Sequence, residues 1–189
     1  MFISKTDLLA VSKDSALQQI AAGTFPTPQI VRAEAFALEE AKSYLNFKYD
    51  TNKVFGVEAF DYDATVSYTT GQVVLSPEGI AYNCILNAPS GTLLTNTDYF
   101  VLGDLRNMLL VMILVDIILY HYYTRLPNNR ITETRIVRYE QAIEKLKQIR
   151  KSQLNLSLPL RDYEATEHTE EQETHTIEII SHEKRNNSY

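Results

Sequence analysis

The feature that most constrains the fold of this chain is the apolar run at residues 108–120, which reads MLLVMILVDIILY. We expect it to lie within one helix that begins near Asp104, ends near Thr124 and is apolar around nearly its whole circumference. The run is shorter than the roughly 18–20 residues that a membrane-spanning helix needs, and Asp116 near its middle would be costly in lipid. The pattern therefore predicts a buried central helix and no membrane partner.

Three segments before this run carry helix signals. Ser4 and Asp7 have the spacing of a capping box, which predicts a short helix over residues 5–11. The run KDSALQQIAAG follows and ends in a glycine, a residue that commonly stops a helix. Thr27 and Pro28 then begin a helix of about 20 residues, because a capping hydroxyl and a proline in the first turn favour a helix start. Its apolar face contains Val31, Leu38, Ala41 and Leu45, with Glu34, Glu39 and Lys42 largely off that face.

Two further segments complete the predicted fold. Residues 57–102 are rich in Thr, Tyr, Val, Gly and Asn, which predicts three or four short strands with turns at TTG, SPEG and APSG. A last helix is expected over residues 131–152, after a turn at Pro127, and its apolar stripe suits antiparallel packing on the central helix. That stripe consists of Ile136, Tyr139, Ile143, Leu146 and Ile149. We therefore predict a mainly α fold, a small helical bundle of about four helices with a small β insert and an extended C-terminal tail.

The predicted domains are a helical domain at residues 1–56 and 103–160, a small β insert at residues 57–102 and an acidic C-terminal tail at residues 161–189. The tail contains eight acidic and three basic residues and has little to bury, so we expect it to be disordered alone. Its segment THTIEII alternates like a strand. We predict that Ile177, Ile179 and Ile180 bind a partner by adding a strand to its sheet. A solvated tail with no partner is the alternative.

The composition excludes several classes of function. The net charge of −6 argues against general nucleic-acid binding, though not against a local basic patch. The single cysteine, Cys84, excludes an internal disulfide and a multi-cysteine zinc site, and no base lies near it in sequence. The six glycines are too widely spread to form a phosphate-binding loop. We therefore predict no catalytic residue, no metal, no cofactor and no enzymatic activity.

Several stretches of the chain together resemble one protein family. They are FISKTDLLA, EEAKSYLNFKYDTNKVF, NLSLPL and above all the pair LRNMLLVMILVDIILYHYYTRLP and ETRIVRYEQAIEKLKQI. Through them, residues 1–56 and 103–160 are similar to the head–tail connector (neck adaptor) proteins of Mu-like tailed phages, in the form from phages of Bacteroides-like bacteria. The insert and the long tail depart from that family. Through YTTGQVVLSPEGIAYNCI and APSGTLLTNTDYF, the insert resembles small β modules related to chitin-binding modules.

The resemblance implies a structural virion protein that is made in the bacterial host cytoplasm and lies at the neck, where head and tail join. Family members form a ring of about 12 copies beneath the portal protein, extend the DNA channel and dock the next neck or tail protein. Packaged DNA would pass without being read, so basic residues facing the channel would touch phosphates only. The channel candidates are Arg135, Arg138, Lys145 and Lys147. Their alternative role is the solvated side of an amphipathic helix.

Two further hypotheses concern Asp116 and the insert. Asp116 on the central helix can pair with Arg135 or Arg138, and we predict a structural core polar pair of Asp116 and Arg138. The alternative function is a carbohydrate-binding or adhesion module carried by the insert. Phe100 stands at the closing aromatic position of that module, and the chain has no tryptophan. Exposed, coplanar aromatic side chains on the insert would favour sugar binding, and a polar face would not.

Overall fold

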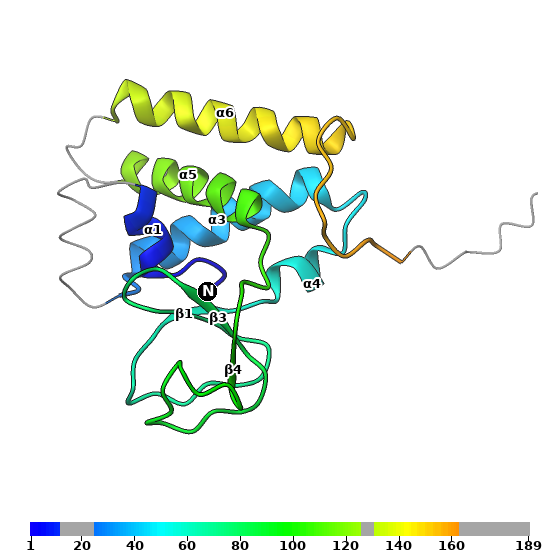
Figure 1. Cartoon of the computed structure of the whole chain (residues 1–189). Helices are drawn as coiled ribbons and strands as arrows, with labels where there is room; N and C mark the ends of the chain where they lie inside the picture. Colours follow the sequence, from blue (N-terminus) through cyan, green and yellow to red (C-terminus); the bar gives the residue numbers. More distant parts are fainter. Residues whose placement is uncertain (12–24, 126–130, 163–189) are drawn as a thin grey trace, which may run out of the picture.

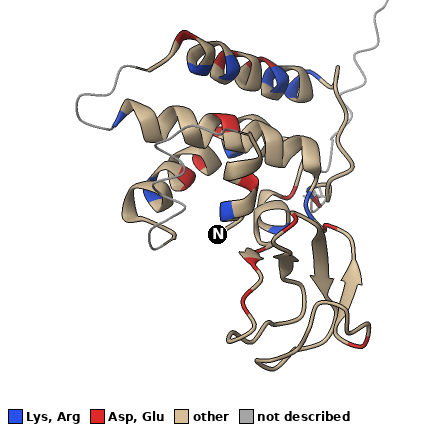
Figure 2. Cartoon of the chain, turned by 60° about the vertical axis from the view of Figure 1, so that its left-hand side comes forward, with Lys and Arg blue, Asp and Glu red and all other residues tan. Residues whose placement is uncertain are grey.

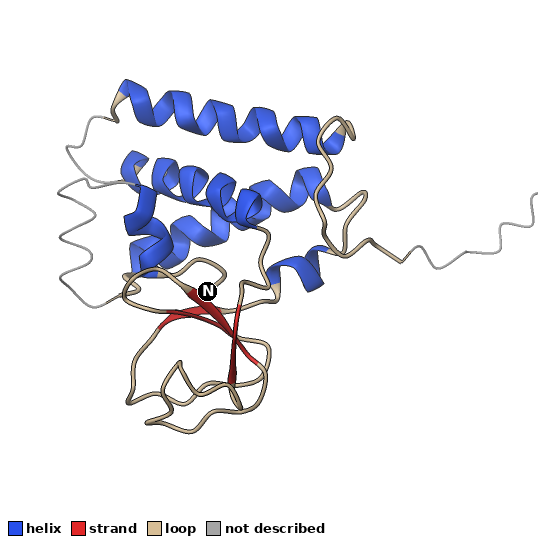
Figure 3. Cartoon of the chain, viewed as in Figure 1, coloured by secondary structure: helices blue, strands red, loops and turns tan. Residues whose placement is uncertain are grey.

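A computed structural model describes residues 1–11, 25–125 and 131–162 of the chain. Within these ranges the chain forms five helices and one four-stranded mixed sheet (Figures 1 and 3). In chain order they are α1 (Lys5–Val11), α3 (Pro28–Leu45), α4 (Thr51–Phe55), β1 (Ala59–Asp61), β2 (Val73–Leu75), β3 (Ala81–Cys84), β4 (Phe100–Leu102), α5 (Met108–Thr124) and α6 (Glu133–Arg150). The prediction of a mainly α fold, a small bundle of about four helices, is therefore wrong, because the chain has an α/β fold.

The physical reason for this correction is that residues 57–102, which we name the β module, build a core of their own. Tyr68, Val74, Cys84, Ala88 and Phe100 form a buried cluster that is separate from the core of the helices. The helices α1, α3, α5 and α6, which we name the helical layer, lie on one side of the sheet in Figure 1. Of these helices, α1 packs against both α5 and β1.

The sheet has the strand order β1-β2-β3-β4. β1 runs parallel to β2, and the other two pairs are antiparallel. The prediction of short strands joined by turns is confirmed, since TTG, SPEG and APSG all lie in connections between strands. In the SPEG turn, the Gly79 N–H donates to the Ser76 carbonyl (2.9 Å) at a φ of +83°, a left-handed conformation that favours glycine. The N-terminus reaches this sheet, because the Ala59 N–H donates to the Met1 carbonyl (2.9 Å).

The helix α5 lies at the centre of the helical layer and packs against α1, α3 and α6. Most of its side chains are buried, which confirms the predicted central helix. It begins at Met108 rather than near Asp104, because the Asn107 side chain accepts the Leu109 and Leu110 N–H groups as a cap. No helix within the described ranges combines the length and apolar character needed to cross a membrane.

The predicted start signals of α1 and α3 are confirmed. The Asp7 carboxylate accepts the Ser4 N–H (2.8 Å), while Ser4 Oγ accepts the Asp7 N–H (3.1 Å). At the start of α3, Thr27 Oγ1 accepts the Ile30 N–H (3.3 Å). The helix α6 lies inside its predicted range. The run KDSALQQIAAG, the turn at Pro127 and the tail beyond residue 162 lie outside the described residues.

Two helix faces differ from the predicted stripes. The buried residues of α3 are Ile30, Ala33, Glu34, Ala37, Ala41 and Leu45. Val31, expected on the apolar face, is 45% exposed, whereas Glu34, expected off it, is buried. On α6, Ile136 is 40% exposed, although Leu146 and Ile149 are buried as predicted. The other predicted residues of both stripes are buried or pack against the core, so only the first residue of each stripe is misplaced. Sequence spacing alone does not locate the ends of the neighbouring helices.

Candidate functional site

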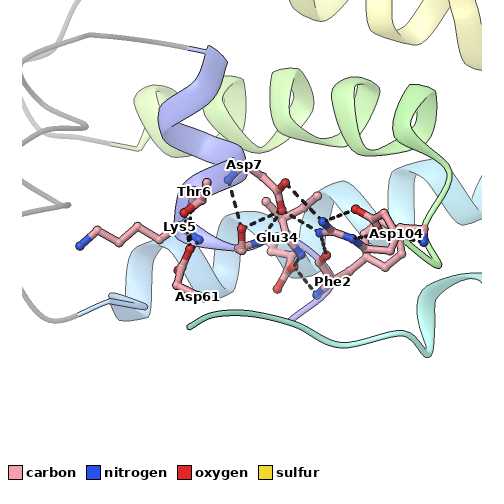
Figure 4. A network of polar contacts seen from close by, with 10 residues as sticks. Phe2, Lys5, Thr6, Asp7, Glu34, Asp61 and Asp104 are labelled. Atoms are coloured by element: carbon pink, nitrogen blue, oxygen red, sulfur yellow. Dashed lines mark hydrogen bonds and ion pairs between the residues drawn. The ribbon is translucent and has the colours of Figure 1, made fainter. Parts of the chain in front are cut away.

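A buried polar network joins the helical layer to the β module (Figure 4). Its centre is Arg106, which is 4% exposed and lies between β4 and α5. The Arg106 guanidinium donates to the Asp7 carboxylate (2.7 Å), the Asp104 carboxylate (2.8 Å) and the Phe2 carbonyl (2.7 Å). Because two carboxylates balance its charge and hydrogen bonds satisfy its donors, this arginine is stable out of water. It joins the N-terminus, α1 and the start of α5 at one point.

Glu34 of α3 holds the N-terminal segment from the other side. Its Oε1 accepts both the Phe2 N–H and the Ile3 N–H, each at 2.9 Å. Burial raises the pKa of Glu34 above its ordinary value, although these two hydrogen bonds and the N-terminal ammonium oppose the shift. Sequence reasoning missed this role. The one available signal was that Glu34 follows the buried Ile30 by four residues, which places both on one helix face.

Asp61, at the end of β1, caps α1 from the β module. Its carboxylate accepts the Lys5 N–H (3.1 Å), the Thr6 N–H (3.0 Å) and the Thr6 hydroxyl. The first N–H groups of a helix have no partner inside the helix, so the strand supplies one. The position of α1 therefore depends on the sheet, and the two regions meet through fixed polar contacts (Figure 4).

Asp116 faces α6 with two arginines near it. Its Oδ1 lies 3.6 Å from Arg135 Nη1 and 3.8 Å from Arg138 Nη1, within the distance of an ion pair. Neither Asp116 Oδ1 nor Arg135 Nη1 makes a hydrogen bond within the described residues. Burial raises the pKa of Asp116, and the charges of Arg138 and Arg135 oppose that shift. Both predicted partners thus lie within ion-pair distance of Asp116 Oδ1, and neither makes a hydrogen bond with it.

The four channel candidates on α6 have different surroundings. Arg135 is buried, with its guanidinium 5.7 Å from the Tyr123 ring centre, so it faces the interior of the helical layer. The side chains of Arg138 and Lys147 are 45% and 50% exposed, and Lys147 lies 3.7 Å from Glu144. Lys145 is partly buried. Basic and acidic residues are interspersed along α6 (Figure 2).

Glu40 of α3 joins the other end of α5 to α6. Its Oε2 lies 2.9 Å from His121 Nε2, and its Oε1 accepts the Tyr139 hydroxyl (2.7 Å). Tyr139 also stacks on Tyr120, with ring centres 3.9 Å apart. Burial first, and then the Glu40 carboxylate, raise the pKa of Tyr139 far above its ordinary value. The tyrosines around His121 therefore pack the end of the helices, and Glu40 fixes their positions.

A pocket of about 330 Å³ lies beside this group, between the start of α3 and the end of α5. We name it the α3–α5 pocket. Its lining residues are Pro28, Gln29, Arg32, His121, Tyr122 and Arg125. The Arg125 guanidinium lies 4.3 Å from the Phe36 ring centre and donates to the His121 carbonyl (2.8 Å). The pocket therefore brings together two arginines and a histidine, and none of its lining residues within the described ranges is acidic.

Two groups of exposed apolar side chains lie at β4 and the start of α5, and on α6. The first, which we name the β4–α5 stripe, consists of Val101, Leu102, Leu105, Met108 and Met112, which are 39% to 69% exposed. The second, which we name the α6 pair, consists of Ile136 and Val137, which are 40% and 43% exposed. The stripe lies at the start of α5, and the pair lies near the start of the antiparallel α6, so they mark opposite ends of the layer (Figure 1).

The aromatic side chains of the β module face inward. Tyr68 and Phe100 are 3% and 1% exposed, and their ring centres lie 6.0 Å apart. Partly buried aromatic residues pack around this pair, namely Phe60, Tyr62, Tyr82 and Tyr99. Cys84 is buried in the same cluster, and burial raises the pKa of its thiol. The aromatic residues of the module therefore form its core, whereas a sugar-binding platform requires exposed rings.

The predicted partner-binding residues Ile177, Ile179 and Ile180 lie outside the described residues. Within residues 1–11, 25–125 and 131–162, no group of three or more His, Cys, Asp or Glu side chains is placed to hold a metal ion. Comparisons with models of protein families, with curated proteins and with solved structures found no match to this chain.

Proposed function

We propose that this chain is a structural virion protein that forms a ring at the portal and neck of a tailed phage. The ring joins head to tail, extends the DNA channel and gives the next neck or tail protein a docking surface. The observation that carries this proposal is the pair of different groups of exposed apolar side chains, one at β4 and the start of α5 and one near the start of α6. A ring built from head-to-tail contacts needs two different patches on each copy, because the front of one copy meets the back of the next.

The β4–α5 stripe and the α6 pair have the character of such patches. Each contains large apolar side chains that are exposed in the single chain. Apolar patches on a protein surface commonly mark interaction sites. The helix α5 has 17 residues, so the two surfaces are separated by roughly 25 Å along its axis. This separation suits a wedge-shaped subunit with neighbours on two sides.

A subunit of a rigid ring also needs parts that keep their relative positions. The contacts of Arg106 and Asp61 hold the β module against the helical layer, and Glu34 holds the N-terminal segment. The exposed Arg138 and Lys147 on α6 would give passing DNA weak phosphate contacts. Arg135 would not, because it is buried.

The first test is the mass of the purified protein in solution, measured by light scattering with and without the portal protein of the same phage. We expect a defined ring, formed either alone or on the portal. A chain that remains monomeric at high concentration and is indifferent to the portal would contradict the proposal.

The second test distinguishes a head-to-tail ring from other assemblies. One variant carries Met108→Glu and Met112→Glu, and the other carries Ile136→Glu and Val137→Glu. Each alone should lose ring formation, because charges at a buried contact are costly. Mixed together, each variant offers one intact surface, so pairs of twice the monomer mass should form. Leu93→Glu in the β module is the matched control and should leave the ring unchanged, because Leu93 is exposed and outside both surfaces.

A further inference from the structure

The α3–α5 pocket has the features of an anion-binding site. Arg32 and Arg125 supply two guanidinium groups, and His121 lies beside them. Pro28 and Gln29 belong to the first turn of the 18-residue helix α3, whose N-terminus carries partial positive charge. None of the described lining residues is acidic, although the Glu40 carboxylate lies 2.9 Å from His121 Nε2. The two guanidinium groups therefore give the pocket a positive charge in a chain whose net charge is −6.

Tyr122 adds a hydroxyl group to the pocket. It lines the pocket and is 8% exposed, and its hydroxyl keeps contact with solvent. Tyrosine commonly presents its hydroxyl in this way while its ring is packed. A carboxylate in the pocket would accept this hydroxyl as well as the guanidinium N–H groups. Because the Phe36 ring and the His121 carbonyl already hold Arg125 in place, little ordering is needed on binding.

The chain itself contains an acidic segment of the kind that this pocket would bind. Residues 163–189 include seven acidic and two basic residues, with adjacent acids at Glu170 and Glu171. This segment starts at the far end of α3 from the pocket. The residues just before this segment lie beside the C-terminal end of α3. The Arg161 N–H donates to the Lys48 carbonyl (3.1 Å), and Leu160 forms a β-bridge with Tyr49.

The pocket and the start of the acidic segment are thus separated by the length of α3. Its 18 residues span about 27 Å at a rise of about 1.5 Å per residue. Figure 1 shows the start of α3 at one end of the helical layer and residues 151–162 at the other. In a head-to-tail ring, the end from which the acidic segment departs faces the pocket end of the next copy. This arrangement places unlike charges against each other across each contact.

We propose that the α3–α5 pocket binds the acidic segment, residues 163–189, of a neighbouring copy of this chain. Arg32 and Arg125 hold carboxylates of that segment, and the Tyr122 hydroxyl donates to one of them. This inference rests on the proposed ring. It adds the contact that links each subunit to the next, and it gives the acidic residues of the tail a role that the predicted strand around Ile177 does not explain.

The first experiment measures binding of a fluorescein-labelled peptide, residues 163–189, to the full-length protein by anisotropy. We expect salt-sensitive binding that Arg32→Glu weakens by about tenfold or more, because a repulsive charge replaces an attractive one. Arg32 is exposed and makes no hydrogen bond or ion pair within the described residues, so the fold should tolerate the change. Arg150→Glu is the matched control on exposed α6 and should bind as the parent does. Equal binding by both variants would overturn the proposal.

The second experiment tests whether the contact joins two copies. Arg32→Lys keeps the charge and adds an amine that a zero-length carbodiimide can couple to a carboxylate, forming an amide bond with loss of water. We expect covalent multiples of the 21.6 kDa chain on a denaturing gel, and peptide mapping should show the introduced amine at position 32 joined to tail glutamates. The tail variant Glu170→Gln and Glu171→Gln should reduce these products. A coupling found only within one chain would overturn the proposal.

The two proposals fail in different ways. A ring that forms normally while residue 32 never couples to the tail would refute the pocket contact and leave the ring standing. A chain that binds the peptide through Arg32 but never assembles, with or without the portal, would contradict the ring. The peptide measurement needs no assembly, so it decides the pocket contact in a monomer as well.

Discussion

The helical layer and the β module are stabilised in different ways. The helical layer has one continuous apolar core, in which α5 is buried by α3, α6 and α1. The strands of the module contain only three or four residues each, and tyrosine hydroxyls join its loops. The Tyr68 hydroxyl accepts the Asp63 N–H (2.7 Å), and the Tyr62 hydroxyl donates to the Thr92 carbonyl (3.1 Å). Short strands bury little apolar surface. Hydrogen bonds of tyrosine hydroxyls therefore contribute a larger share of the stability of the β module than of the helical layer.

The two regions also differ in charge. The β module contains five acidic residues and no Lys or Arg, so all 18 basic residues lie outside it (Figure 2). The cation that joins the regions, Arg106, lies just after the last strand of the module. The acidic Asp61 in turn caps a helix of the other region. The junction therefore depends on a few polar side chains, whereas each region has an apolar core of its own.

The largest expected effect breaks that junction. Arg106→Met should lower the free energy of unfolding by about 3–5 kcal/mol, because the carboxylates of Asp7 and Asp104 would be left near the interior without their cation. Urea unfolding followed by circular dichroism measures this loss. Arg150→Met, on the exposed end of α6, is the control and should change the free energy of unfolding by less than about 0.5 kcal/mol. A loss below about 1 kcal/mol at Arg106 would mean that the two cores hold together without the network.

The next effect concerns Glu34 and has a pH signature. Glu34→Ala should cost about 2–3 kcal/mol, because the buried Phe2 and Ile3 N–H groups lose their acceptor. Glu34→Gln keeps an oxygen in that place and should cost less. In the folded chain the pKa of Glu34 is raised above 4.5, so the folded state binds the proton more tightly than the unfolded state.

The stability contributed by protonated Glu34 is therefore complete below about pH 4.5 and is lost as the pH rises through the folded-state pKa. Unfolding curves of the parent and Glu34→Gln, measured from acid to neutral pH, test this sign. The parent should gain stability relative to Glu34→Gln as the pH falls toward 4.5. An opposite trend would show that the two backbone hydrogen bonds outweigh burial.

A smaller effect is expected inside the β module. Tyr68→Phe removes the hydroxyl that accepts the Asp63 N–H and keeps the ring, so it should cost about 1–2 kcal/mol. Hydrogen exchange should quicken at β2 and β3, while the amides of α5 keep their protection. Tyr82→Phe is the control, because Tyr82 packs against the same cluster and its hydroxyl makes no hydrogen bond within the described residues. Equal loss of protection in α5 would show that the two regions unfold as one unit.

The smallest effect is expected at Asp116. Asp116→Asn should change the free energy of unfolding by less than about 1 kcal/mol, because the carboxylate is desolvated and its arginine contacts are long. Denaturant unfolding measures the free energy of unfolding of Asp116→Asn and of Arg106→Met. The two values compare an ion pair without hydrogen bonds, at Asp116, with a hydrogen-bonded one, at Arg106. A cost above about 2 kcal/mol would indicate that Asp116 holds α6 in place more firmly than its geometry implies.

Much of the local structure could be predicted from the sequence. The capping box of Ser4 and Asp7, the Thr27–Pro28 start of α3 and the three turns of the β module all act within a few residues. The apolar run of α5 likewise requires a central position, whatever surrounds it. The candidate surfaces were harder to predict, because exposure of Met108 or Ile136 depends on where the neighbouring helices end.

The sequence was enough to predict α1, α3, α5, α6 and the short strands, and to place α5 at the centre, because backbone preferences and apolar spacing are local properties. It did not predict the five-residue helix α4. Only the tertiary structure decided the α/β arrangement, the burial of Glu34 and the partners of Arg106. Asp7 lies 99 residues from Arg106, and Phe2 lies 32 residues from Glu34. A polar side chain becomes buried only where distant groups satisfy its hydrogen bonds, and no pattern within a short stretch of sequence records those groups.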